Sequence, residues 1–295
     1  MRAKYVNPFT DFGFKKIFGE EASKPSLIDF LNALLPDYAH IKDLSFKNPE
    51  HLGVTIYDKR AIFDLYCEND HGEKFIVEMQ KAKQDFFKER TIFYSTFPIR
   101  QQAEKGPWNF NLKAVFCIGI LDFVFNDYTG GLGDKQVIHE IKLRNKEGKT
   151  FYDKLTYIYL EMPNFRKNEK ELETRLDKWL YFINNLEDFD GIPQIFANEV
   201  LFIDALEKAE LANFSFEEYD SYEESLKVFR DLINVVDTAK REGREQGIKE
   251  GVEEGIKEGI KEGKIEVAKA LKSSGITSEV ISKTTGLTTE EIEQL

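Results

Sequence analysis

The 295-residue sequence contains only two cysteines, Cys67 and Cys117, so it lacks the cysteine pairs of a disulfide scaffold. It also lacks an excess of positive charge, because 41 Lys and Arg residues stand against 53 Asp and Glu residues. The net charge of -12 excludes a simple basic protein that coats nucleic acid. The longest apolar run, residues 114–125, is interrupted by Asp122 and is too short to span a bilayer.

The amino-terminal residues contain no apolar segment of the kind found in secretion signals. With so few cysteines, this predicts a cytoplasmic protein in a reducing compartment, with no membrane partner. Aromatic residues, by contrast, are abundant: they make up 13% of the chain and include 25 Phe and 12 Tyr. A disordered chain does not carry such a load, so we expect a globular protein with a buried core.

The acidic charge is concentrated in one segment. Residues 1–105 hold 16 basic and 16 acidic side chains, whereas residues 161–224 hold 17 acidic and 6 basic ones. Residues 81–105 are locally basic, with six Lys and Arg residues against three acids. This stretch either faces a polyanion or forms a solvated helix face.

The amino-terminal third predicts helices around a β-hairpin. A first helix should begin at Thr10 or Asp11, which are both good N-cap residues, and a second is expected over Ser26–Leu35, before Pro36. A short strand is expected over residues 41–46. Residues 60–68 and 74–80 are rich in β-branched and aromatic side chains and are joined by the turn sequence Asn-Asp-His-Gly, which predicts a hairpin. A helix over 84–105, kinked or shortened at Pro98, should follow.

The middle of the chain alternates strands and helices. Residues 112–125 form a nearly continuous apolar run, typical of a strand that is covered on both faces. Val137–Arg144 and Leu155–Met162 are predicted to form a further pair of strands. From about residue 168 the pattern becomes helical, with one apolar stripe made of Trp179, Phe182, Ile183 and Leu186. These elements predict an α/β fold.

The carboxyl-terminal segment is a glycine repeat. Six glycines recur every four residues from Gly243 to Gly263, and Ile248, Val252, Ile256 and Ile260 follow four of them. Each interior glycine costs a helix about 1 kcal/mol relative to alanine. A helix with this composition is therefore either a dimerisation arm, in which small residues allow close packing, or a weakly helical spacer.

Residues 264–295 have the outline of a helix-turn-helix, and Thr288 with Glu291 matches a capping box. The last helix is acidic and would repel phosphate, so a packing cap is favoured over a DNA-reading unit. We expect residues 1–238 to form one domain, with a helical portion over 165–238. Residues 239–295 would form the glycine-repeat arm and a short two-helix cap.

The hairpin carries the residues that point to chemistry. Strand alternation places Asp64 between Ile62 and Tyr66 on one face, and Glu78 with Gln80 on one face of the returning strand. Two acids on adjacent strands repel unless one is protonated or a cation lies between them. Carboxylate and carbonyl oxygens suit a hard divalent cation, and the carbonyl of Met79 could add a third ligand. Gln80 could orient a water molecule.

The segments DFGFKKIFG, FDLYCENDHGEKFIVEMQ and KERTIFYSTFPIRQQAEKG, followed by LKAVFCIGILDFVF, resemble in this order the PD-(D/E)XK nuclease superfamily. Within it they resemble the recombination-promoting nuclease and transposase (Rpn) family, whose carboxyl-terminal tails are similar in style to the glycine repeat. The resemblance implies a restriction-endonuclease-like fold, a mixed central sheet flanked by helices, that cuts DNA with Mg²⁺ or Mn²⁺.

Carried over position by position, the resemblance implies that Asp64, Glu78 and Gln80 are catalytic, and that Asp64, Glu78 and the Met79 carbonyl bind the metal. Gln80 stands where many superfamily members have Lys, so more of the activation would fall to the metal. The remaining residues implied to contact DNA are Lys15, Lys16, Arg90, Tyr94 and Gln102, with Gln101 as an alternative to Gln102. For each of these helix residues, a surface salt bridge is the structural alternative.

The sequence thus predicts a metal-dependent DNA endonuclease linked to recombination, transposition or mobile elements, forming a homodimer through its tail. The competing hypothesis is a nuclease-fold protein with weak or no catalysis that acts as an interaction module. A third possibility is that the tail regulates the nuclease core.

Overall fold

The computed structural model describes residues 3–51, 61–103, 106, 108–125 and 136–295. The chain divides into two compact units, Met1–Ile233 and Asn234–Leu295. The α-helices are α1 (Asp11–Phe18), α2 (Lys24–Leu34), α3 (Phe87–Gln101), α4 (Arg175–Asn185), α5 (Val200–Ala209), α6 (Phe216–Ser273), α7 (Ser278–Thr285) and α8 (Thr289–Glu293). The strands are β1 (Leu44–Phe46), β2 (Glu50–His51), β3 (Ala61–Ile62), β4 (Leu65–Asn69), β5 (Lys74–Gln80), β6 (Val115–Leu121), β7 (Ile138–Arg144) and β8 (Thr150–Glu161).

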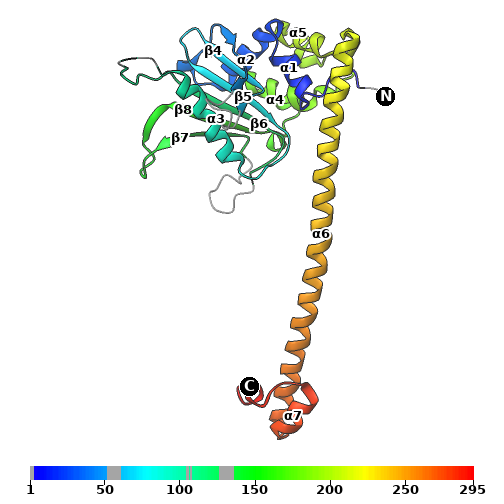
Figure 1. The fold of residues 1–295 in the computed structure, drawn as a ribbon. Coiled ribbons are helices and arrows are strands. Elements are labelled where there is room, and N and C mark those ends of the chain that lie inside the picture. Colours follow the sequence, from blue (N-terminus) through cyan, green and yellow to red (C-terminus); the bar gives the residue numbers. More distant parts are fainter. Residues whose placement is uncertain (1–2, 52–60, 104–105, 107, 126–135) are drawn as a thin grey trace. The chain divides into compact units, whose positions relative to one another are not determined.

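The first unit is built on a six-stranded mixed sheet with the strand order β1-β4-β5-β6-β8-β7 (Figure 1). The pairs β5–β6 and β6–β8 are parallel, and the other pairs are antiparallel. Strands β2 and β3 form a separate two-stranded ladder. The predicted mixed sheet and the predicted hairpin, now β4–β5, are confirmed.

Strand β6 lies at the centre of the sheet and is buried along its whole length, as its apolar run predicts. Phe116, Ile118 and Ile120 face the side packed by α1, α2, α4 and α5, while Val115, Cys117 and Leu121 face the side packed by α3. Gly119 has a packing reason, because a Cβ atom there would lie 2.9 Å from the ring of Tyr159.

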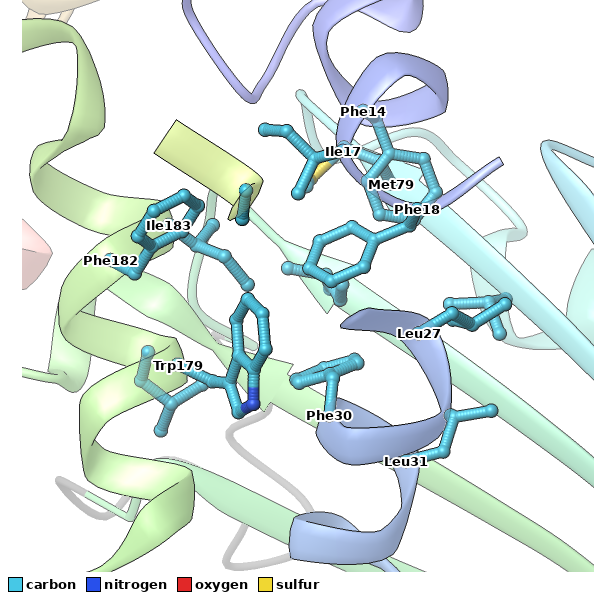
Figure 2. Close-up of a cluster of buried hydrophobic side chains, with 14 of the residues drawn as sticks. Phe14, Ile17, Phe18, Leu27, Phe30, Leu31, Met79, Trp179, Phe182 and Ile183 are labelled. Atoms are coloured by element: carbon cyan, nitrogen blue, oxygen red, sulfur yellow. The ribbon is translucent and has the colours of Figure 1, made fainter. Parts of the chain in front are cut away.

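Aromatic side chains fill the larger core (Figure 2). Helices α1, α2 and α4 contribute rings that contact each other, and the centroid of the Trp179 ring lies 5.5 Å from that of Phe18 and 4.4 Å from that of Phe202. The predicted apolar stripe, made of Trp179, Phe182 and Ile183 in α4 and Leu186 directly after it, is fully buried. This core holds α1 against the sheet, next to the β4–β5 hairpin.

The strand predicted over residues 60–68 is broken. Residues Phe63 and Asp64 lie between β3 and β4, so Asp64 sits in a bend and not in the middle of a strand. Alternation also fails here, because Phe63 does not share a face with Leu65. Its ring packs on the α3 side, with centroids 5.2 Å from Tyr94 and 6.4 Å from Phe97. Long-range packing of Phe63 explains this local change.

The second unit contains the end of α6 with α7 and α8. Ala268, Ile281, Leu287 and Ile292 form its small core, and Thr288 and Glu291 form the predicted capping box. At each of the six repeat glycines, an added Cβ atom would meet no atom of the described residues within 4 Å, and the isoleucines of the repeat are about half exposed. In the described part of the chain no helix has the length and apolar character needed to cross a membrane.

Candidate active site at the β4–β5 hairpin

Asp64 is fixed against β5 through the backbone of the residue after Glu78. A carboxylate oxygen of Asp64, Oδ2, accepts a hydrogen bond of 2.7 Å from the N–H of Met79. The bend at residues 63–64 makes this contact possible, because it turns the Asp64 side chain toward β5. The two predicted acids are therefore brought together.

Both acids have perturbed pKa values. Burial, together with the negative charge of Asp64, raises the pKa of Glu78 to about 8, while Arg90 opposes the rise. Burial also raises the pKa of Asp64, and the nearby Asp11 carboxylate adds to this effect. Oε1 of Glu78 is buried and has no hydrogen-bond partner among the described residues. A buried carboxylate oxygen without a partner is costly unless it is protonated or meets a cation.

The backbone N–H and carbonyl of Met79 point toward the side of β5 on which Asp64 lies. Lys74 donates its N–H to Ala114, and the carbonyl of Gln80 accepts from Asp122, so the even-numbered residues of β5 direct their backbone groups toward β6. Neighbouring residues of a strand direct theirs the opposite way. Met79 therefore directs its N–H and its carbonyl toward the β4 side, where Asp64 lies.

Helix α3 covers this site with polar and aromatic groups. The Arg90 guanidinium donates hydrogen bonds to Oε1 of Gln80 and Oε1 of Gln84, and it lies 5.8 Å from the centroid of the Tyr94 ring. The Gln80 side chain is also fixed at its other end, since Nε2 donates to the carbonyl of Ala82 at 2.9 Å. Arg90, Tyr94, Phe87 and Glu78 line one small cavity.

Helix α1 supplies a second group of charges near Asp64. Lys15 pairs with Asp11 at 3.0 Å, and both residues act on the Asp64 carboxylate. Lys81 also faces Asp64 and Asp11, and its ammonium nitrogen lies 5.4 Å from the centroid of the Phe229 ring in α6. Sequence reasoning missed Lys81 and Asp11. The one available signal was the position of Lys81 directly after Gln80.

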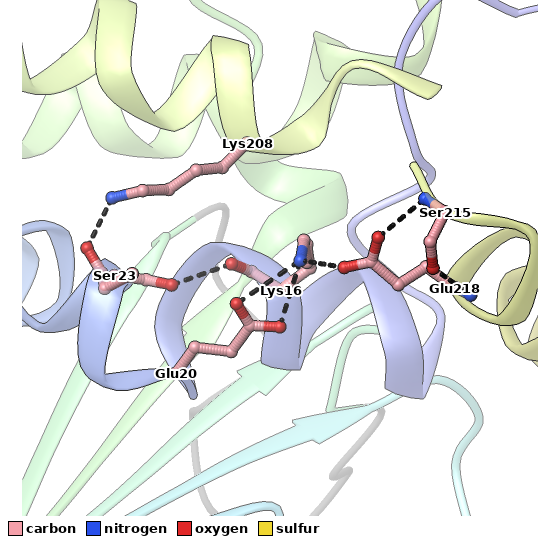
Figure 3. A network of polar contacts seen from close by, with 7 residues as sticks. Lys16, Glu20, Ser23, Lys208, Ser215 and Glu218 are labelled. Carbon is pink, nitrogen blue, oxygen red and sulfur yellow. Dashed lines mark hydrogen bonds and ion pairs between the residues drawn. The ribbon is translucent and has the colours of Figure 1, made fainter. Parts of the chain in front are cut away.

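Two of the predicted DNA-contacting residues lie elsewhere. Lys16 pairs with Glu20 at 3.2 Å and with Glu218 at 2.6 Å, in a network that joins α1 to the first turn of α6 (Figure 3). Gln102 accepts a 2.7 Å hydrogen bond from the N–H of Lys113, near the beginning of β6. The alternative, Gln101, accepts from the hydroxyl of Tyr66 at 2.8 Å.

Phe86 has an unusual backbone just before α3. Its φ of 59° and ψ of 27° lie in the left-handed region, and no side chain caps the first turn of the helix. For a residue other than glycine this conformation costs about 1–2 kcal/mol. Phe110 has the same φ of 59°.

The donor set suits a hard divalent cation. No group of three or more His, Cys, Asp or Glu side chains that could hold a metal is found within the described residues. Mg²⁺ does not require such a group, since it is commonly bound by one or two carboxylates together with waters and substrate phosphates. Asp64, Glu78 with its unpartnered oxygen, and the carbonyl of Met79 fit that pattern.

A mixed sheet between helices, with one acid on a central strand and a second acid brought next to it from the adjoining bend, is compatible with the PD-(D/E)XK nuclease fold. A protein-family model described as a PD-(D/E)XK nuclease family transposase matches residues 8–239. The chain therefore belongs to this family, as its sequence resemblance predicts. Neither a curated protein nor a solved structure matches the chain significantly.

Proposed function

We propose that this protein is a DNA endonuclease that depends on Mg²⁺ or Mn²⁺ and serves recombination, transposition or mobile-element biology. The observation that carries the proposal is the acid pair: Asp64 is hydrogen-bonded to β5 beside Glu78, its negative charge acts on Glu78, and a buried oxygen of Glu78 has no partner among the described residues. Membership of a nuclease and transposase family supports DNA as the substrate.

Different residues of the site would bind the metal, orient the attacking water and bind the phosphate. When bound by Asp64, Glu78 and the carbonyl of Met79, a divalent cation would lower the pKa of a coordinated water and polarise the phosphate. Oε1 of Gln80 accepts one hydrogen bond from Arg90 and has a second lone pair, which can accept from the attacking water. Arg90 has five N–H donors, so those not used by Gln80 and Gln84 can bind a phosphate oxygen. The ring of Tyr94 packs against the Arg90 guanidinium and helps to hold it in place.

A plasmid-nicking assay tests this function. We expect the wild-type protein to nick plasmid with Mg²⁺ and not with EDTA, and Asp64→Ala to reduce the rate at least 100-fold while circular dichroism stays unchanged. Asp70→Ala is the matched control, since Asp70 lies in the turn of the same hairpin. Full cleavage by Asp64→Ala would reject the assignment. Absence of both nicking and metal binding in the wild type would favour the interaction module instead.

We further infer that two copies associate through the glycine repeat of α6. The repeat presents glycines with open space beside them and half-exposed apolar side chains in one continuous row. Six glycines cost an isolated helix about 6 kcal/mol, which close packing against a second helix can offset.

A further inference from the structure

Phe86 combines two features that the described residues do not explain. Its backbone is in the left-handed region, where bulky side chains are rare, and its side chain is 76% exposed. Burial of the ring therefore does not compensate for the backbone strain. Residues held in strained conformations cluster at functional sites.

Its position connects it to the candidate active site. The carbonyl of Phe86 accepts a 2.9 Å hydrogen bond from the N–H of Arg90, whose side chain reaches Gln80. The next residue, Phe87, lines the cavity that contains Glu78. An exposed ring thus lies one residue from the cavity wall and one helical turn from the arginine of the site.

We propose that Phe86 stacks on a nucleobase of the DNA strand whose phosphate binds to Arg90 at the candidate active site, a proposal that rests on the proposed function. Aromatic side chains stack on bases of any sequence, because every base has a π face. A base within a duplex is already stacked on both sides, so the ring reaches it only where the helix is opened. The substrate is then DNA with unpaired bases: single strands, mismatches or frayed ends.

The charges around Phe86 are compatible with a nucleic acid. Lys83 and Lys88 flank it in sequence, and the stretch 81–90 holds four basic residues against two acidic ones. In proteins that bind single strands, basic side chains contact the phosphate backbone and aromatic rings stack on the bases. A protein partner for this ring is an alternative that the experiment below separates.

Phe110 supplies a matched control. It has the same φ of 59° and is 74% exposed, but it follows the other end of α3 and packs against Trp108, with ring centroids 4.6 Å apart. Glycine adopts positive φ without strain, so Phe86→Gly and Phe110→Gly remove similar rings and similar strain. Only the first change removes a ring from the residue whose carbonyl accepts the hydrogen bond of the Arg90 N–H.

The test measures binding of the full-length protein to a single-stranded oligonucleotide carrying 2-aminopurine, in EDTA so that cleavage is not required. We expect Phe86→Gly to weaken binding about 5- to 150-fold and to lose the fluorescence change that stacking produces. Phe86→Trp should retain both, and Phe110→Gly should stay within twofold of wild type. The midpoint temperature of thermal unfolding of Phe86→Gly should not fall below that of the wild type.

Unchanged binding by Phe86→Gly, or an equal loss in Phe110→Gly, would overturn the stacking proposal. The first of these outcomes would favour a protein partner for the ring. Equal binding of duplex and single strands by the wild type would also overturn the proposal, because a base must be unpaired to stack on Phe86. A wild type that nicks plasmid while Phe86→Gly binds normally rejects the stacking alone. A wild type that binds through Phe86 but never cuts rejects the nuclease function alone.

Discussion

The carboxyl group of Glu78 must lose a proton before it can bind a cation, and burial raises its pKa to about 8. Metal binding should therefore release a proton at neutral pH. We expect the affinity for Mg²⁺ to rise roughly tenfold per pH unit below about pH 8 and to level off above it. Calorimetric titrations between pH 6.5 and 9, in two buffers of different ionisation enthalpy, measure both the affinity and the released proton.

Glu78→Gln is the control for this pH dependence. Its amide has no proton to lose, so the remaining weak metal binding should not vary with pH over the same range. An affinity of the wild type that is equal at pH 6.5 and pH 8, with no proton release, would contradict the prediction.

The pairing of Asp64 with Glu78 could be predicted from the sequence, because alternation along β5 fixes the face of Glu78 and the hairpin turn fixes its register. The details around Asp64 could not. The bend that places its carboxylate on the N–H of Met79 depends on Phe63 packing against α3. The Arg90–Gln80 hydrogen bond likewise joins two elements whose relative position no local pattern encodes.

At the scale of elements, α1 places two neighbouring lysines in different surroundings, although the family resemblance assigns both of them to DNA contact. Lys15 is exposed and acts on Asp64, whereas the Lys16 side chain is 13% exposed and binds Glu20 and Glu218. We expect Lys16→Met to lower the free energy of unfolding by about 1–2 kcal/mol, because it removes the partly buried ion pairs that Lys16 forms with Glu20 and Glu218. Lys15→Met should instead reduce DNA cleavage several-fold and leave stability within about 0.5 kcal/mol.

Urea unfolding and the nicking assay, applied to both variants, provide the comparison. If Lys16→Met abolishes cleavage without loss of stability, then Lys16 contacts DNA, as the family resemblance implies, and its pairs with Glu20 and Glu218 do not stabilise the fold. If neither variant alters cleavage, α1 does not contribute to the substrate site.

The order of elements in the first unit could be predicted because each has a strong local signal: the apolar run of β6, the turn between β4 and β5, and the aromatic stripe of α4. The strand order could not, since β5, β6 and β8 are parallel neighbours that need crossover connections. Only the family resemblance implied a mixed sheet.

At the scale of the whole molecule, the glycine repeat of α6 should control association. Its spacing of four residues exceeds the 3.6 residues of a helical turn, so the row of glycines rotates about 40° per repeat around the helix. Paired helices following such a row would wrap with a right-handed twist. A helix packed this closely has no room for a Cβ atom at each glycine, whereas a free spacer does.

Replacing Gly251 and Gly255 with alanine separates these cases. In a spacer, each change stabilises the helix by about 1 kcal/mol and leaves the oligomeric state unchanged. In a packed pair, the added methyl groups hold the helices apart, so we expect the dimer dissociation constant of the full-length protein to rise at least tenfold. Sedimentation equilibrium measures it, with Glu253→Ala as the control at a charged position of the same segment. A wild-type protein that remains monomeric, or a double variant that dimerises as well as wild type, would contradict association through the repeat.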